Sequence, residues 1–355
     1  LDPVTSAEID QLMLDLTRKL GVTSVVVTHE MDSAFTIADR MVMLDKGRAL
    51  RVDTRENFDA DWVRRQRTPI VVKASGLAAG KGVLIVDTAE EAISAARAMF
   101  DGQFGEAGVE VVIEEFLPGE EASFIVMADG EHVLPFATSQ DHKRIGDGDT
   151  GPNTGGMGAY SPAPVVTPAM HERIMREVIW PTIRGLAADG MPYTGFLYAG
   201  IMIAPDGTPN VLEYNCRFGD PETQPIMARL RSDLPGLCEA ALEGRLNAVT
   251  MDWDPRAAVG VVIAAGGYPD SYEKGLPIAG LAEAAELPGK IFHAGTSLHD
   301  GEVVTNGGRV LCAVGLGDDV STAQRAAYAL VDRLCFKDIR YRRDIGHRAI
   351  ARERG

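Results

Sequence analysis

Apolar positions along the chain repeat with two periods, one typical of strands and one typical of helices. Helical spacing and a capping box of Thr88 with Glu91 predict a helix over residues 89–100, and a second amphipathic helix is predicted over residues 323–334. Short apolar runs bounded by turn residues predict strands around these helices. The predicted strands cover residues 69–73, 109–117, 119–127, 133–136, 195–203, 209–215, 261–264, 292–295 and 310–314. This mixture of elements predicts an α/β (α+β) fold.

The first part of the chain follows a different pattern. Residues 1–52 predict a helix, a strand, a second helix and a closing hairpin. Residues 53–67 are charged and lack a clear period, with Phe58 and Trp62 as the only large apolar anchors. We therefore predict a junction over residues 53–67, a larger domain over 68–249 and a C-terminal domain over 250–355.

Composition and charge narrow the class of protein. The 355 residues are 45% hydrophobic and 24% charged, as in a soluble globular protein, and no apolar run reaches the length of a membrane span. The start at Leu1 has no leader pattern, so we expect a cytoplasmic protein with no membrane partner. We also expect a monomer. A net charge of −16 argues against nucleic-acid binding. The basic run over residues 337–354 is interrupted by acids and predicts a solvated helical end.

The four cysteines lie far apart and form no CxxC pair. Their spacing favours reduced, buried thiols over a disulfide framework or a zinc site. They are Cys216, Cys238, Cys312 and Cys335.

A glycine-rich stretch follows the strand that ends in Lys73. Glycines at 76, 80 and 82 allow backbone amides to approach an anion, and Lys73 and Lys81 add positive charge. The stretch is not a Walker A loop, because it is one residue short and has Gly82 where Ser or Thr would bind magnesium. A tight hairpin without a ligand is an equally good interpretation of the glycines alone.

Two oxygen donors fall on one face of the strand predicted over residues 209–215. Side chains alternate across a strand, so Glu213 and Asn215 point to one side and Tyr214 to the other. Magnesium binds a few protein oxygens and completes its shell with phosphates and water, so this pair suits a metal–nucleotide complex. A polar, exposed strand face is the alternative for these two residues taken alone.

Polar residues in two further segments suggest a binding site for an anionic substrate. Arg217 precedes a predicted helix start around Pro221, where free amides and a guanidinium can hold phosphate or carboxylate. The segment over residues 149–160 is long and glycine-rich, which suits a loop that closes over a substrate. His142 lies just before it and is interpreted as a structural histidine rather than a base.

Residues 1–52 resemble the C-terminal end of an ABC transporter ATPase. Leu1-Asp2-Pro3 matches the D-loop of that family, and residues 27–31 with 38–40 match its switch-histidine region. The Walker A, signature and Walker B motifs are not found, so His29 has no γ-phosphate to sense. We expect a partial fragment without chemistry of its own.

Residues 68–355 resemble the phosphoribosylamine–glycine ligase family. The strings SQDHKR, DTGPNTGGMGAYSPAP, YTGFLYAG, EYNCRFGDPETQP, AAGGYP, FHAGT, TNGGRVL and RRDIG occur in that order over residues 139–346. The resemblance implies an ATP-grasp fold followed by a small C-terminal mixed α/β domain. It also implies ATP and Mg²⁺ or Mn²⁺ as cofactors, and glycine and 5-phosphoribosylamine as substrates.

The same resemblance assigns roles to individual residues. ATP binding is implied for Lys73, Gly76, Ala79, Gly80, Lys81, Gly82, Glu114, Leu117 and Glu121. Substrate binding is implied for Asp141, Asn153, Thr154, Gly155, Gly156, Met157, Gly158, Asp220 and Glu222. Metal binding falls to Glu213 and Asn215, and charge stabilisation during catalysis to Arg217, Lys73 and Lys143. The turn at residues 306–309 either closes the site or is purely structural.

In the ATP-grasp scheme, ATP phosphorylates the carboxylate of glycine, and the amine of phosphoribosylamine then displaces phosphate. The family's N-terminal domain is not found in the sequence, so a ligase-family enzyme, active or impaired, is expected. The strand at 69–73 is expected at a sheet edge that is either unpaired or covered by the preceding segment. A non-catalytic nucleotide-binding fragment and a transporter ATPase subunit are the alternatives.

Overall fold

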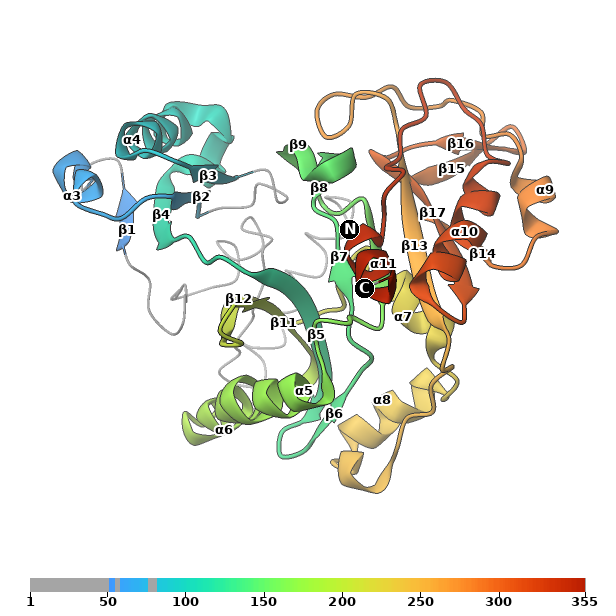
Figure 1. The fold of residues 1–355 in the computed structure, drawn as a ribbon, viewed down its shortest axis with the longest axis horizontal. Helices are drawn as coiled ribbons and strands as arrows, with labels where there is room; N and C mark the ends of the chain where they lie inside the picture. Colours follow the sequence, from blue (N-terminus) through green and yellow to red (C-terminus); the bar gives the residue numbers. More distant parts are fainter. Residues whose placement is uncertain (1–50, 55–57, 76–81, 355) are drawn as a thin grey trace, which may run out of the picture. The chain divides into compact units, whose positions relative to one another are not determined.

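The computed structural model describes residues 51–54, 58–75 and 82–354 (Figure 1). The chain divides into two compact units. Unit 1 consists of Leu1–Gly119, Glu177–Tyr193 and Ala199–Cys216, and unit 2 of Glu120–Arg176, Thr194–Tyr198 and Arg217–Gly355. The chain therefore passes between the units several times, which no pattern in the sequence indicated.

Unit 1 contains an antiparallel sheet with the strand order β1-β4-β2-β3. Its strands are β1 (Arg51–Thr54), β2 (Ile70–Ala74), β3 (Val83–Val86) and β4 (Glu110–Glu115). Helix α4 (Ala89–Ala98) begins at the predicted capping box of Thr88 with Glu91 and buries Ile93 in a core with Ile70 and Val72. The predicted strand–helix–strand order is thus confirmed here.

The predicted sheet edge at residues 69–73 is wrong. Strand β2 lies between β4 and β3, with Val71 opposite both Glu114 and Ile85. The position beside β4 is taken by β1, in the register Val52↔Val112. The pairing of β1 with β4 is made by main-chain hydrogen bonds. The sequence pattern of residues 51–54 does not indicate which strand they pair with.

The segment predicted as a junction contributes to the core of unit 1. Helix α3 (Ala60–Arg64) is capped by the Asp59 carboxylate and buries Val63 completely. Phe58 and Trp62, the two anchors noted in the sequence, pack against the same core. Residues 58–67 therefore fold with the strands that follow them.

The other described parts of unit 1 are α6 (Trp180–Ala188), β12 (Pro209–Asn215) and the second half of β11 (Thr194–Ile203). Tyr214 on β12 shares a 2.7 Å hydrogen bond with Thr182 on α6. The phenol therefore fixes which face of β12 is turned toward this helix. Short helical turns complete the unit, η1 (Met99–Gln103) and η2 (Gly105–Gly108).

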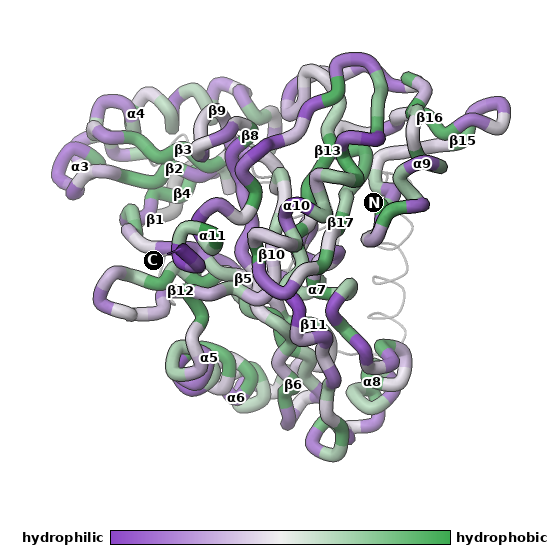
Figure 2. Tube along the Cα trace, turned by 45° about the vertical axis from the view of Figure 1, so that its right-hand side comes forward, coloured by the Kyte–Doolittle hydropathy of each residue, from purple (hydrophilic) through white to green (hydrophobic). Residues whose placement is uncertain are grey.

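Unit 2 is built on a five-stranded sheet with the order β14-β17-β13-β10-β7. Its strands are β7 (Gln140–Asp141), β10 (Gly158–Ser161), β13 (Ala257–Ala264), β14 (Lys290–His293) and β17 (Arg309–Gly317). Strand β13 is buried at every position, and hydrophobic colours run along β13 and β17 in Figure 2. Helix α10 (Val320–Val331) contacts both strands, and Ala323 and Ala327 lie against glycines of β17. These elements form the largest core of the unit.

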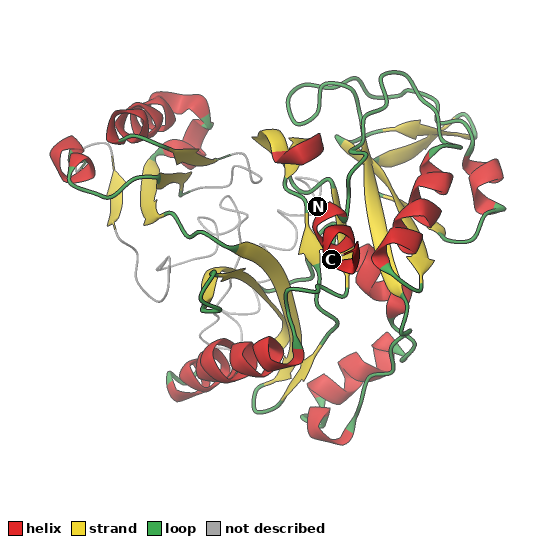
Figure 3. Cartoon of the chain, viewed as in Figure 1, coloured by secondary structure: helices red, strands yellow, loops and turns green. Residues whose placement is uncertain are grey.

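Smaller elements surround this sheet, and Figure 3 distinguishes their strands, helices and loops. Hairpins pair β5 with β6, β8 with β9, and β15 with β16. Their bounds are β5 (Glu120–Asp129), β6 (Val133–Pro135), β8 (Arg144–Gly146), β9 (Thr150–Asn153), β15 (Thr296–His299) and β16 (Glu302–Thr305). The helices are α5 (Pro168–Ile174), α7 (Thr223–Arg229), α8 (Leu234–Leu242), α9 (Leu281–Ala285) and α11 (His347–Arg354), with the short turns η3 (Asp147–Asp149) and η5 (Leu246–Ala248). The π-helical turn η4 (Met175–Ile179) connects α5 to α6 across the division of the units.

Three predictions about single features need correction or comment. The basic run is not uniformly solvated, because the Arg342 side chain is completely buried. All four cysteines are free thiols, but of them only Cys312 is fully buried, whereas Cys216 and Cys335 are exposed. Within the described residues, none of the helices combines the length and hydropathy needed to cross a bilayer.

Candidate active site

The lysine predicted to bind phosphate lies in the middle of the unit 1 sheet. Lys73 on β2 forms an ion pair with Glu114 on β4. Val71 is the residue directly opposite Glu114, so Lys73 reaches it diagonally along the same face. Glu114 is only 8% exposed, and a buried carboxylate is stable when a cation compensates it. The sheet thus brings two of the predicted ATP-binding residues together.

The glycine-rich loop after Lys73 is described only at its end. Gly76, Ala79, Gly80 and Lys81 lie outside the described residues. The Gly82 carbonyl accepts a 2.8 Å hydrogen bond from the Ala74 amide, which joins the two ends of the loop to the β2–β3 pair. The side chain of Leu117, a further predicted nucleotide contact, is buried.

The two predicted metal ligands stand two residues apart on β12. Tyr214 between them points toward α6, so Glu213 and Asn215 share the opposite face. Glu213 is exposed and Asn215 is buried. Among the described residues no group of three or more His, Cys, Asp or Glu side chains could hold a metal. One carboxylate beside one amide oxygen fits a magnesium ion that takes its other ligands from phosphates and water.

Unit 2 contains a second pair of lysine and glutamate. The Lys143 ammonium lies 2.5 Å from the Glu121 carboxylate, so a residue predicted to bind ATP and one predicted to act in catalysis meet directly. Gln140 donates to the Glu121 carbonyl at 3.0 Å, which ties β7 to the start of β5. Asp141, half-buried on β7, pairs in register with Ala159 on β10.

The predicted substrate loop is closely tied to the segment that carries Lys143. Thr154 donates its amide and its hydroxyl to the Lys143 carbonyl, at 2.7 and 2.8 Å. The Met157 amide donates to the His142 carbonyl at 2.8 Å, and Asn153 pairs in register with Arg144. The sequence predicted one long loop, but residues 150–153 and 158–161 are strands, so only the four residues between them form a loop. The Met157 side chain is completely buried in the core, so only its main chain can contact a substrate.

Asp220 and Glu222 stand in the turn between β12 and α7, but their environments differ. Asp220 is exposed, whereas Glu222 is only 3% exposed and accepts a 2.7 Å hydrogen bond from the Ser123 hydroxyl. Ser123 lies 3.1 Å from the Tyr198 hydroxyl, which completes a buried polar cluster. A Cβ on Gly219 would lie 2.5 Å from the Glu222 carboxyl carbon, so the glycine makes room for this carboxyl group.

Burial decides the protonation of this cluster. Removal from water raises the pKa of Glu222, although Ser123, Lys143 and Arg217 favour the ionised form. Burial and the neighbouring Glu222 also raise the pKa of Tyr198 well above its ordinary value. Arg217 itself is exposed and donates to the Phe218 carbonyl at 3.0 Å. The turn therefore combines an exposed cation with a buried carboxyl group that ionises reluctantly.

Comparisons with known proteins assign these features to a family. Residues 25–223 match Phosphoribosylglycinamide synthetase, ATP-grasp (A) domain, and residues 258–348 match Phosphoribosylglycinamide synthetase, C domain. The phosphoribosylamine–glycine ligase of Vibrio parahaemolyticus is 65% identical over 293 residues, which are 82% of this chain and 68% of that protein. The chain belongs to the phosphoribosylamine–glycine ligase family.

Further relatives agree with this assignment. The phosphoribosylamine–glycine ligase of Pseudomonas aeruginosa is 64% identical over 295 residues, 83% of this chain and 69% of that protein. The crystal structure of the Thermotoga maritima ligase aligns with a TM-score of 0.69 and 40% identity, covering 84% of this chain and 74% of that one. An L-amino acid ligase from Bacillus licheniformis, 16% identical with a TM-score of 0.54 over 92% of this chain and 71% of that one, shows a shared fold only. The predicted ATP-grasp fold with a C-terminal mixed α/β domain is confirmed.

The match to the ligase family begins inside the segment that resembles a transporter ATPase. The match to the ATP-grasp domain of the ligase family starts at residue 25, whereas the resemblance to the transporter ATPase covers residues 1–52. Residues 1–50, including His29, lie outside the described residues. The resemblance to a transporter is therefore not part of the family assignment.

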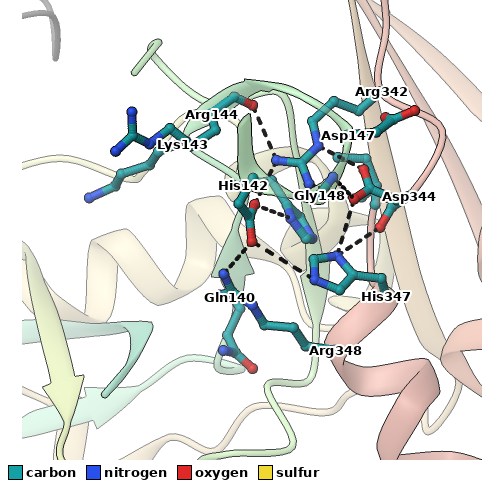
Figure 4. Close-up of polar contacts among 12 residues, drawn as sticks. Gln140, His142, Lys143, Arg144, Asp147, Gly148, Arg342, Asp344, His347 and Arg348 are labelled. Atoms are coloured by element: carbon teal, nitrogen blue, oxygen red, sulfur yellow. Dashed lines mark hydrogen bonds and ion pairs between the residues drawn. The ribbon is translucent and has the colours of Figure 1, made fainter. Parts of the chain in front are cut away.

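His142 occupies a structural position in this ligase-family chain. Its Nε2 accepts a 2.9 Å hydrogen bond from the Gly346 amide, and its Nδ1 lies 3.7 Å from the Asp149 carboxylate. Figure 4 shows His142 beside His347 and Arg342. Burial lowers the pKa of His142, so the neutral form with a proton on Nδ1 is favoured. With Nε2 already engaged, the geometry agrees with the structural interpretation of this residue.

Arg342 is the residue that sequence reasoning missed. Its buried guanidinium donates to Asp149 at 2.8 Å, to both Asp344 oxygens at 2.8 Å and to the Arg144 carbonyl at 3.1 Å. Contact with His142 and with Arg342 lowers the pKa of Asp149. Burial alone would raise the pKa of Asp344, but Arg342 lowers it to about 2. In the sequence, the one acid that follows two arginines in RRDIG was the only signal for this network.

Proposed function

We propose that this chain joins glycine to 5-phosphoribosylamine at the expense of ATP, giving glycinamide ribonucleotide, ADP and phosphate in purine biosynthesis. The identity of 65% over 293 residues with a phosphoribosylamine–glycine ligase carries the proposal, because that stretch includes the residues assigned to ATP, metal and substrates. The reaction passes through a phosphorylated glycine carboxylate, which the amine of phosphoribosylamine attacks.

In unit 1, Lys73 and the metal ligands act on the nucleotide. Lys73 sits on a rigid strand, so its ammonium is held in place for phosphate oxygens without reorganisation during the reaction. Glu114 compensates the lysine charge and keeps the side chain extended along the sheet. Glu213 and Asn215 would hold Mg²⁺ or Mn²⁺, which neutralises phosphate charge when bound.

In unit 2, Lys143 and Arg217 supply positive charge for the carboxylate and the transferring phosphoryl group. The loop from Asn153 to Gly158 and the turn at Asp220 hold the two substrates close together, which converts a slow encounter into a reaction within one complex. Glu222 belongs with them as a buried carboxyl group next to these cations. Since the acyl phosphate hydrolyses in water, we expect the loop also to shield it from solvent.

Finer expectations accompany this proposal. We infer that the protein is a cytoplasmic monomer that binds neither nucleic acid nor a membrane. The derivation of residues 1–52 from a transporter ATPase, and the boundaries at residues 53, 68 and 250, stay predictions from the sequence.

The test is ADP release by the purified chain. We expect release that requires both glycine and phosphoribosylamine, and its loss in Glu213→Ala. Glu302→Ala, which removes an exposed carboxylate on β16, is the matched control and should keep full activity. ATP binding without substrate-dependent release would contradict the proposal and favour a non-catalytic nucleotide-binding fragment.

A further inference from the structure

Arg309, the first residue of β17, reaches from the C-terminal sheet to two segments of the proposed substrate site. Its guanidinium donates to the Gly155 carbonyl at 2.6 Å and to the Asp220 carbonyl at 2.9 Å. A second nitrogen lies 2.8 Å from the Asp220 carboxylate. All of these contacts lie within unit 2. One side chain therefore binds the substrate loop and the turn before α7 at the same time.

The backbone that carries Arg309 is held by close glycine contacts. The Gly295 amide donates to the Arg309 carbonyl at 2.9 Å, and the Gly307 amide donates to the Gly295 carbonyl at 3.0 Å. A Cβ on Gly295 would lie 2.5 Å from the Gly307 Cα, so these two strands of chain can approach only as glycines. The motifs FHAGT and TNGGRVL thus converge to fix the origin of the Arg309 side chain.

The third glycine motif of the C-terminal domain acts on the same loop. Tyr268, from AAGGYP, lies against Gly308, where an added Cβ would be 2.4 Å from its ring. The Tyr268 hydroxyl accepts a 3.1 Å hydrogen bond from the Gly155 amide. Arg309 binds the carbonyl of the same residue, so both polar groups of Gly155 are fixed from the C-terminal domain.

The contacts of Arg309 and Tyr268 fall on the two glycines of the loop, whose backbones have the most freedom to lose. Gly156 has a φ of 107°, a conformation that side chains rarely adopt. A Cβ on Gly156 would also lie 2.3 Å from the Pro221 ring, so the loop passes directly over the turn. Glycine backbones lose more conformational entropy on ordering than other residues, and the hydrogen bonds of Arg309 oppose that loss.

We propose that Arg309 is a positioning residue for ligation, with Tyr268 as its partner, and that it holds Gly155, Gly156 and Asp220 in the geometry that binds the substrates. This inference rests on the proposed function. The turn at residues 306–309 is then a part of the substrate site that acts through the loop, rather than a purely structural corner.

Arg309→Met tests the proposal by two measurements on the full chain. Amide hydrogen exchange of Gly155, Gly156 and Met157 should rise, because their hydrogen bonds depend on a fixed loop. In steady-state kinetics, kcat/KM for glycine and phosphoribosylamine should fall roughly 100-fold, as expected for a misplaced reacting group, with the KM for ATP unchanged. Arg309→Lys should recover only part of this, because an ammonium cannot span the separated oxygens.

Arg325→Met is the matched control, since Arg325 hydrogen-bonds only to Ser321 and Thr322 of its own helix among the described residues. Unchanged exchange at residues 155–157 in Arg309→Met would overturn the proposal, whether or not the chain is active. Absence of ADP release by the parent would instead refute the proposed function, and the exchange measurement would still decide the role of Arg309.

Discussion

Among the described residues with predicted site roles, two lysine–glutamate pairs are buried or half-buried, one in each unit, and they are built in different ways. Lys73 and Glu114 stand on neighbouring strands of one sheet in unit 1, where the register alone brings them together. Lys143 and Glu121 come from separate elements of unit 2, and the main chain around Lys143 is held by Thr154. The first pair depends on regular structure, and the second on a network of individual hydrogen bonds.

This difference shows which interactions determine the position of each pair. A sheet places side chains by alternation, so a local pattern is sufficient to foresee which residues share a face. In unit 2, the loop at Gly155 and the turn at Asp149 are held by residues distant in sequence, Arg309 and Arg342 respectively. Changes at those distant positions should therefore disturb the second region and leave the first intact.

The largest expected effects separate the two lysines. Lys73→Met should raise the KM for ATP, whereas Lys143→Met should act on glycine and phosphoribosylamine, each lowering kcat/KM on the order of 100- to 1000-fold. Steady-state kinetics with each substrate varied in turn measures both. Lys337→Met removes a lysine with an exposed ion pair to Glu273 and should change neither. The same substrate dependence in both variants would erase the distinction between the two pairs.

Removal of Arg342 should weaken unit 2 strongly. Arg342→Met leaves Asp149 and Asp344 without their buried cation, which costs about 3 kcal/mol in the free energy of unfolding. Because the folded-state pKa of Asp344 is about 2, the stabilisation is present above the ordinary Asp pKa and is lost as the pH falls toward 2. Thermal unfolding of parent and variant should therefore differ most at neutral pH and converge in acid.

The matched variant for this comparison is Arg64→Met. Arg64 forms ion pairs with Asp61 and Glu90 at the surface, where such pairs contribute little. Equal loss of stability in the two arginine variants at neutral pH would show that burial of Arg342 is unimportant.

A smaller effect tests whether the former junction belongs to unit 1. Val63→Ala should lower the free energy of unfolding by about 2 kcal/mol, because Val63 is completely buried in the core with Ile93. Val109→Ala in the same unit is the control, since Val109 is 62% exposed. Indistinguishable melting curves for the two variants would place residues 58–67 outside the cooperative fold.

The smallest expected effect concerns Glu222. Its folded-state pKa is raised, so the acid form is favoured and stability is lost as the pH rises through and above the ordinary Glu value. Glu222→Gln keeps the acceptor for the Ser123 hydroxyl and has no charge to bury. The melting temperature of the variant relative to the parent should therefore rise as the pH increases above the ordinary Glu pKa of about 4.3. A difference that stays constant across this range would rule out a raised pKa.

Much of unit 1 could be predicted from the sequence, because its signals are local. The capping box at Thr88 and the shared face of Glu213 and Asn215 follow from helix and strand periods. The pairing of β1 could not be predicted, since an edge strand bonded through its main chain needs no side-chain pattern. The strand period indicated a metal–nucleotide site at Glu213 and Asn215, whereas the individual ATP-binding roles came from family resemblance.

Less of unit 2 could be foreseen. The basic run over residues 337–354 suggested a solvated helix, because a sequence does not reveal which carboxylates a given arginine will meet. Asp149 lies in η3 between β8 and β9, so its position beside Arg342 depends on this hairpin. The buried cluster of Ser123, Tyr198 and Glu222 likewise joins residues whose sequence environments give no common period.

The strand β1 has a consequence for how the protein behaves in concentrated solution. By pairing with β4, it covers a row of main-chain groups that another chain could otherwise extend. This pairing is made by main-chain groups of residues 51–54. A proline there would remove a donor, uncover part of the edge and turn the sheet of unit 1 into a template for self-association.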